Sequence, residues 1–354
     1  MLMSILFATA YNLMSIQKTL IPIINPIRSD LVEVQSIVKT LLNSDQKSPV
    51  SKMGAHLSQS PGKNIRAIIT LLSYHITCDR LTITNSPAIE KGIKIAASIE
   101  HIHLASLVHD DIIDGSDLRR GIPTITTAFG ENQAIIMGVY IYALSLSLLS
   151  EVGNMDILQK ISSTVQTLCA GESKQISNRH QVPETTEEYL RIVYEKTGVL
   201  FQTACYAGAR LVTTDNEILT DLEILGAEFG LIFQLTDDYL DIFGDGAELN
   251  KKAGQDLLSG DITLPLLFFL KTLNPNQREK VLYDIREGRT SSIDPSLLKE
   301  NITIVKDQTQ EIIRQSLEKI QTVLSKFPNS DYLDSFLLLT ETISNRCLST
   351  VPTP

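Results

Sequence analysis

Helical periodicity runs through most of this 354-residue chain, and it is the feature that most restricts the fold. Apolar residues recur at intervals of three and four, whereas alternating strand-like runs between turn residues are scarce. No Gly/Ser linker and no repeat of solenoid length divides the sequence. We therefore expect an all-α, single-domain helical bundle. The expected helices cover residues 61–78, 132–150, 162–177, 187–212, 216–243 and 301–326, and the clearest one runs from an N-cap at Ser86 to near Gly115.

Composition and charge argue against a general nucleic-acid binder. Hydrophobic residues make up 43% of the chain and charged residues 20%, which suits a globular protein with a sizeable core. The formal net charge is -10, whereas neutralising a phosphate backbone requires a broadly basic surface. An anionic ligand would therefore need local cations or metal ions.

The cysteines do not form a disulfide framework or a zinc site. Cys78, Cys169, Cys205 and Cys347 lie far apart, with neither a Cys-x-x-Cys pair nor zinc-ligand spacing. We expect reduced thiols and, without a recognisable secretion signal, a cytoplasmic location.

Residues 1–25 are expected to be an extension that precedes a domain of residues 26–354. The first twenty residues are mostly apolar but contain no cation before Lys18, whereas a secretion signal begins with positive charge. Polar residues such as Asn12 interrupt the segment, so it would span a membrane poorly. Translation could also begin at Met14.

An Asp-Asp-x-x-Asp motif ends two of the expected helices. Residues three and four apart lie on one helical face, so each triad forms a tight acidic cluster. The C-terminal position adds an unfavourable interaction with the helix dipole. Magnesium ions, which bridge carboxylates to substrate phosphates, fit this need for positive charge best. The two triads are Asp110, Asp111 and Asp114, and Asp237, Asp238 and Asp241.

A solvated acidic helix face would explain one such triad equally well. Two copies favour a metal site, because each is followed by a cationic pair, Arg119-Arg120 or Lys251-Lys252. Carboxylates for metal ions beside cations for oxyanions are typical of a diphosphate pocket. The Asp spacing does not match an EF-hand, and no Gly-x-x-x-x-Gly-Lys-Ser/Thr loop is present.

With these motifs, the sequence resembles the trans-type polyprenyl diphosphate synthases of medium or long product length. The resemblance covers the chain from about Gly62 to Pro265. It rests on 62–66 (Gly-Lys-Asn-Ile-Arg), 100–103, 109–114 with 118–121, Gly171-Glu172 with Gln175, Lys196-Thr197-Gly198, 234–241, Lys251, Gly254, Asp256 and Thr263-Leu264-Pro265.

The resemblance implies a helical bundle in which both triads face one another across a deep central cavity and share three magnesium ions. The two substrates would be an allylic diphosphate and isopentenyl diphosphate. Metal and cations would let the allylic carbon–oxygen bond ionise, water would be excluded, and released pyrophosphate would take the final proton. The allylic diphosphate would be held by Arg119, Lys196, Gln234 and Lys251, with Thr197 and Gln175 at its reacting end. Isopentenyl diphosphate would be held by Lys63, Arg66, His103 and Arg120.

Taken singly, these residues have simpler explanations. Lys63 and Arg66 fit a solvated first turn, and His103 fits a core histidine. Lys196 fits a surface lysine, and the glutamines fit ordinary helix positions. Their joint occurrence in the order of the family favours the site.

Small residues upstream of the first triad predict a product longer than geranylgeranyl diphosphate. In the family, an aromatic side chain four or five positions before the triad closes the tunnel beneath a short product. Ala105 and Ser106 occupy these positions, with Ile102 further back. A bulky residue of a neighbouring helix, such as Tyr140 or Tyr142, could close the tunnel instead.

Several positions depart from the family pattern. Asn64 and Ala67 replace a basic residue and a proline, Val139 replaces an aspartate, and Asn250 replaces a glycine. Asp261 replaces a lysine, which we expect to place a negative charge near the second triad. Both triads remain intact.

Three other functions explain the sequence less completely. A terpene synthase would mix Asn, Ser and Glu in its second metal motif, whereas this chain has a second full Asp triad. A metallohydrolase using His109-Asp110 would leave that triad and the arginine pair unexplained. A catalytically silent subunit of a two-subunit synthase would have lost the acidic motifs. The family implies a homodimer, and in some members a small accessory subunit.

Overall fold

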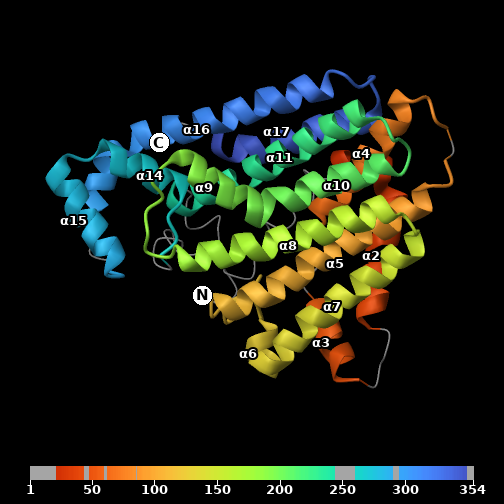
Figure 1. The fold of residues 1–354 in the computed structure, drawn as a ribbon, viewed down its shortest axis with the longest axis horizontal. Helices are drawn as coiled ribbons and strands as arrows, with labels where there is room; N and C mark the ends of the chain where they lie inside the picture. The colour runs from red at the N-terminus through yellow and green to blue at the C-terminus, as the bar shows by residue number, and fades with distance from the viewer. Residues whose placement is uncertain are drawn as a thin grey trace.

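Long α-helices make up almost all of the computed structural model, which describes residues 21–43, 48–59, 62–84, 86–243, 260–289 and 295–348 (Figure 1). The only strands among these residues are β1 (Leu118–Arg119) and β2 (Ile122–Pro123), which pair antiparallel. The all-α prediction is therefore confirmed. The helices are η1 (Asn25–Ile27), α2 (Arg28–Leu42), α3 (Pro49–Leu57), α4 (Ile65–Arg80), α5 (Ile89–Ile113), α6 (Ile125–Phe129), α7 (Glu131–Val152), α8 (Met155–Ser177), α9 (Thr186–Val193), η2 (Tyr194–Gly198), α10 (Val199–Arg210), α11 (Asn216–Phe243), α14 (Leu264–Thr272), α15 (Pro275–Arg286), α16 (Pro295–Leu324) and α17 (Asp331–Leu348).

Most predicted helices are present, and their ends differ where local signals were misjudged. Ser86 is not the N-cap of α5, because Ala88 holds that position while the Ser86 hydroxyl accepts a hydrogen bond from the Ala88 N–H. The end of α5 was predicted correctly, since Gly115 has a φ of 60° that stops the helix. Helix α8 begins earlier than predicted, with Asn154 capping the Ile157 N–H.

Two glycines allow the central helices to approach closely. A Cβ atom on Gly208 of α10 would lie 2.3 Å from the Thr70 carbonyl oxygen of α4. A Cβ atom on Gly226 of α11 would lie 2.4 Å from the Phe201 carbonyl oxygen of α10. Helix α10 therefore packs tightly between α4 and α11, in the middle of the main hydrophobic core.

A second, smaller core lies where α5 meets α7. It contains Leu42, Met53, Ala105, Val108, Ile125, Ala134, Met137 and Ile141. The main core extends to residues before the predicted domain boundary, because Ile23 is fully buried in it. The rest of the predicted extension, residues 1–20, lies outside the described residues.

Helix α7 is unusually apolar on its outer face. No charged residue occurs from position 132 to 150, and within the described residues only this helix is long and apolar enough to cross a membrane. Its inner face packs on α5. Its outer face exposes Ile135, Ile136, Val139 and Leu146, and we call these four residues the α7 patch.

Candidate active site

The first triad ends α5, and a tight hairpin folds two arginines back toward it. Asp110 and Asp111 lie in the last turn of α5, and Asp114 is the C-cap. Strands β1 and β2 are joined by Arg120 and Gly121, both with positive φ (53° and 83°), as a two-residue hairpin turn requires. The turn brings Arg119 Nε to 2.8 Å from Asp111 Oδ1, where it donates a hydrogen bond.

The second triad ends α11 and is tied to the neighbouring helices. The carboxylate of Asp238 is almost fully buried and accepts hydrogen bonds from the Tyr189 hydroxyl and from Gln234 Nε2, the latter at 2.9 Å. Thr197 in turn donates to Gln234 Oε1 at 2.9 Å. Asp237 lies 3.4 Å from Arg346 Nη1, near the end of α17.

Arg66 is subject to the charges of both triads. It is buried in the first turn of α4, and its guanidinium lies over the ring of Phe201, 4.4 Å from the centroid. Burial lowers the pKa of Arg66 to about 10, while the nearby carboxylates of Glu100, Asp237 and Asp110 oppose this shift. The charges of one aspartate from each triad therefore act on this guanidinium at the start of α4.

Other predicted cations surround the same point. Burial lowers the pKa of Lys63, and it lies close enough to Arg346, Asp237 and Arg120 for their charges to contribute. Burial likewise lowers the pKa of Arg120, which is near Glu100. This cluster of positive charge would repel itself unless an anion were bound, so it is suited to a diphosphate.

His103 lies among the arginines and is held neutral. Burial lowers its pKa well below the usual value, and the charges of Arg66, Arg120 and Arg119 lower it further. A neutral imidazole can donate a hydrogen bond to an anionic ligand without titrating near neutral pH.

Lys196 and Thr197 reach the site from a π turn. The α9–α10 segment was predicted as one helix, but η2 interrupts it at residues 194–198. Gly171 of α8 makes room for this bulge, since a Cβ atom there would lie 2.8 Å from the Glu195 carbonyl carbon. Lys196 Nζ lies 3.1 Å from Glu172 Oε2, and although burial lowers its pKa, Glu172 and Asp110 outweigh burial and raise it. Such π bulges are frequent at functional sites.

The carboxylates near the first triad carry excess negative charge. Burial raises the pKa of Asp110 to about 7, and Glu172 raises it too, while Lys196 and Arg119 oppose the shift. A divalent cation fits a group of oxygen ligands in this state. Within the described residues, however, no three His, Cys, Asp or Glu side chains are grouped closely enough to hold a metal ion by themselves. A metal ion here would have to share its coordination with diphosphate oxygens and water.

Two arginines of the site were missed by sequence analysis. Arg346 comes from the last helix, and Arg179 comes from the turn after α8, where its Nη2 donates to Asp114 Oδ1 at 2.7 Å. Neither lies in a motif, so no local signal identifies them. Asp261 was expected near the second triad, and the structure shows in addition that its charge acts together with those of Arg179, Lys196 and Asp114, which belong to the first triad or lie beside it. Lys251 and Lys252 lie outside the described residues.

The residues proposed to set product length differ in their surroundings. Ala105 is fully buried in the core between α5 and α7, and Ile102 is buried in the main core. Ser106 is partly exposed to solvent, and its hydroxyl donates a hydrogen bond to the His103 carbonyl at 2.8 Å. Tyr142 of α7 lies near Asp110, and burial raises its pKa to about 12.

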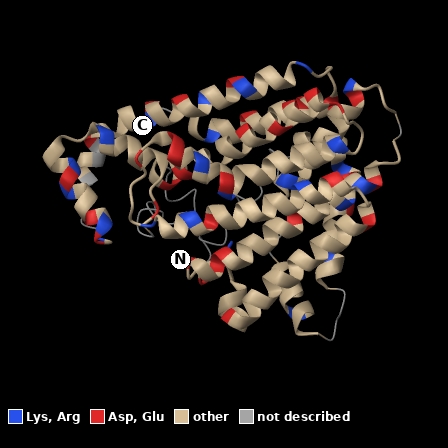
Figure 2. Ribbon diagram, in the orientation of Figure 1, with Lys and Arg blue, Asp and Glu red and all other residues tan. Residues whose placement is uncertain are grey.

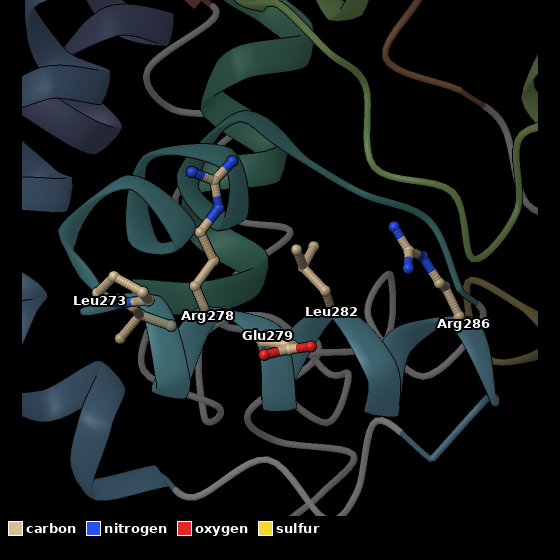
Figure 3. Close-up of a pocket in the computed structure, with 6 residues that line it drawn as sticks. Leu273, Arg278, Glu279, Leu282 and Arg286 are labelled. Carbon is tan, nitrogen blue, oxygen red and sulfur yellow. The ribbon is translucent and has the colours of Figure 1, made fainter.

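An open groove of about 320 Å³ lies elsewhere, at the end of the bundle formed by α14 and α15 (Figure 3). Arg278, Leu282 and Arg286 project from α15 along it (Figure 3). It contains none of the predicted site residues and no carboxylate triad. Figure 2 shows acidic and basic segments distributed along most of the helices.

Comparisons with known proteins point to one family. Residues 47–301 match the model of the family described as polyprenyl synthetase. The chain is 36% identical over 241 residues to heptaprenyl diphosphate synthase component 2 of Geobacillus stearothermophilus, covering 68% of this chain and 72% of the relative. It is 30% identical over 311 residues to octaprenyl diphosphate synthase of Escherichia coli (strain K12), covering 87% and 93%. A crystal structure of polyprenyl synthase from Caulobacter crescentus CB15, complexed with calcium and isoprenyl diphosphate, superposes with a TM-score of 0.79 at 26% identity, covering 91% of this chain and 96% of that one.

Proposed function

This chain belongs to the polyprenyl synthetase family, and we propose that it extends an allylic diphosphate with isopentenyl diphosphate to an all-trans polyprenyl diphosphate of medium or long length. The observation that best supports this proposal is that the charges of Asp110 and Asp237, one aspartate from each triad, both act on the buried guanidinium of Arg66. A cyclase needs one diphosphate site, whereas this arrangement surrounds the triads with a second cationic group at the start of α4. That group suits the second substrate.

We assign the two diphosphates to different cations. Arg119, Lys196 and Gln234 lie beside the carboxylates of the triads and would hold the allylic diphosphate, together with Lys251. Thr197 and Gln175 would line its reacting end. The isopentenyl diphosphate site comprises Lys63, Arg66, His103 and Arg120.

We assign up to three magnesium ions to Asp110, Asp111, Asp114, Asp237, Asp238 and Asp241. Bound magnesium would supply neutralising charge for the departing diphosphate. Lys196 and Arg119 add fixed positive charge on the same side, so the leaving group is stabilised as its bond to the allylic carbon breaks. The double bond of isopentenyl diphosphate then attacks the allylic cation, and the released diphosphate accepts the proton.

Incubation with magnesium, labelled isopentenyl diphosphate and farnesyl diphosphate tests this function directly. Elongated diphosphates that disappear when a chelator is added support it. A hydrocarbon or alcohol product would instead identify a cyclase. Absence of turnover by the protein alone, with activity restored by a second subunit, would identify a two-subunit synthase, a possibility raised by the similarity to a protein named component 2.

We predict that Ser106→Phe shortens the product. Of the positions proposed to set product length, Ser106 retains accessible surface next to His103, so a phenyl ring there can obstruct a growing chain. Chromatography of the products should show a shift toward shorter chains, with Ser162→Phe on the exposed side of α8 as the control. If wild-type enzyme makes only farnesyl or geranylgeranyl diphosphate, the tunnel is already closed and the length assignment is wrong.

The fully buried position Ala105 should respond differently. A phenyl ring at Ala105 would overpack the small core between α5 and α7, which costs about 1–3 kcal/mol. We therefore expect Ala105→Phe to lower the unfolding midpoint.

We further propose that the enzyme is a cytoplasmic homodimer whose interface includes the α7 patch. This face has no charged residue, and Val139, which replaces an aspartate of the family pattern, makes it more apolar; its side chain is 59% exposed in the single chain. Association would remove this surface from water at a gain of roughly 25 cal/mol per Å². Residues 26–354 would form the single synthase domain.

The α7 patch gives a direct test of dimerisation. Ile136→Asp, at a residue of the α7 patch that is 52% exposed in the single chain, is expected to convert the dimer to monomer in light-scattering measurements, because an unpaired carboxylate would be buried in the interface. Leu337→Asp on α17, also at an exposed apolar residue, serves as the control. A wild-type monomer, or an Ile136→Asp dimer, would contradict the proposed interface.

A further inference from the structure

Arg179 lies at the edge of the first triad with a guanidinium that is only partly used. Its Nη2 donates to Asp114 Oδ1 at 2.7 Å, and its Nε lies 3.9 Å from Asp261 Oδ1. That Nε is buried and makes no hydrogen bond with the described residues. Three quarters of the side chain is covered, with 25% still exposed. The guanidinium is therefore held in place but keeps N–H groups for another acceptor.

Two turns hold Arg179 and Asp261 together. The His180 N–H donates to the Gly260 carbonyl at 2.8 Å, joining the turn after α8 to the segment before α14. Gly260 has a φ of 85°, and a Cβ atom there would fall 2.4 Å from His180 Cε1, so a larger residue would push the turns apart. Arg179 and Asp261 flank this junction, and their separation is fixed by it.

The carboxylates around Asp261 create an excess of negative charge that requires a nearby cation. Asp261 adds a carboxylate to a region that already contains Asp110, Asp114 and Glu172. Burial raises the pKa of Asp261, whereas a hydrogen bond from Gln175 and the charges of Arg179 and Lys196 oppose the shift. Without Arg179, this side of the site would repel a diphosphate.

We propose that Arg179 is a further diphosphate-binding residue and that Asp261 is its positioning residue. The proposal rests on the diphosphate site proposed above and extends it to a residue outside the motifs. Asp261 is an anion at a position where the family pattern has a cationic lysine. In this chain Arg179, from the turn after α8, would supply the positive charge instead. A diphosphate can bind this guanidinium beside Asp114, because Arg179 uses only Nη2 for Asp114 and a guanidinium can donate further charge-assisted hydrogen bonds to phosphate oxygens.

Calorimetric titration of the protein with inorganic diphosphate in the presence of magnesium tests the role of Arg179. We expect R179Q to weaken diphosphate binding about tenfold, since it removes one charge-assisted hydrogen bond. The KM for the allylic diphosphate should rise by a similar factor, while that for isopentenyl diphosphate changes less than about twofold. R314Q, at an exposed arginine of α16, is the control.

The charge exchange is tested by restoring a lysine at position 261. In the R179Q background, D261K should recover most of the lost diphosphate affinity, a result that a merely structural role of Arg179 would not produce. Unchanged binding by R179Q, or a double variant no better than R179Q, would overturn the proposal. Elongation by the wild-type protein is assayed in parallel: its absence contradicts the proposed function itself, whereas normal elongation with unchanged binding by R179Q contradicts only the role of Arg179.

Discussion

Replacing Asp110 or Asp237 with alanine is expected to lower turnover by a factor on the order of a thousand or more, with helix content unchanged. Each substitution removes a carboxylate whose charge acts on Arg66, and with it a proposed ligand for the cation that would neutralise the leaving diphosphate. Neither side chain supports the core, because Asp237 is exposed and Asp110 is partly exposed. We therefore expect both substitutions to lower turnover without unfolding the protein.

Steady-state assays with saturating magnesium measure turnover, and circular dichroism measures helix content. Asp110→Asn and Asp237→Asn preserve the shape of the side chain and should be nearly as inactive, since the charge is what is needed. Glu318→Ala, at an exposed acidic position of α16, should be fully active. Retention of more than about a tenth of wild-type turnover in either alanine variant would rule out that residue as a metal ligand.

The second large effect is expected at His101, a residue outside the site. Its side chain is fully buried in α5, and neither ring nitrogen makes a well-formed hydrogen bond with the described residues. Burial lowers the pKa of His101 from 6.5 to about 4, opposed only by a backbone group of Val38. The imidazole is therefore neutral in the folded protein at any pH above about 4.

This depressed pKa should make the protein less stable in acid. Between pH 6.5 and about 4 the unfolded chain binds one proton more than the folded chain at this site, so stability present above pH 6.5 is lost as the pH falls. At about 1.4 kcal/mol per pH unit, the loss reaches about 3 kcal/mol. His101→Leu should remove that part of the pH dependence, and it should destabilise the protein only slightly at pH 7.5, because the imidazole loses only a weak hydrogen bond to the backbone of Val38.

Denaturant titrations at pH 7.5 and pH 4.5 would measure this difference. His56→Gln, at a less buried histidine of α3, is the matched control. If wild type and His101→Leu lose the same free energy of unfolding between the two pH values, His101 is not the group that titrates. The comparison of variants cancels the contributions of the many carboxylates that also titrate in this range.

The α5–hairpin unit was largely predictable because its signals are local. Apolar residues at helical spacing define α5, and Gly115 ends it just after the triad. The Arg119-Arg120-Gly121 sequence then folds back by a turn that needs two positive φ angles, and this brings the arginines to the carboxylates that precede them. These contacts join residues fewer than ten positions apart, so sequence spacing constrains them strongly.

Sequence by itself determined the helical class, the two acidic triads and most of the cations beside them, since each depends on side-chain spacing within one helix or one turn. Only the tertiary structure decided which distant groups complete the site. Arg346 from α17, Arg179 from the turn after α8 and the π turn carrying Lys196 reach the triads through packing between helices. The tertiary structure also brought Asp261 close to Arg179 and to Asp114 of the first triad. Such contacts depend on the angles and separations at which helices pack. Gly171, for example, allows α8 to approach the backbone of Glu195, which lies 24 positions further along the chain.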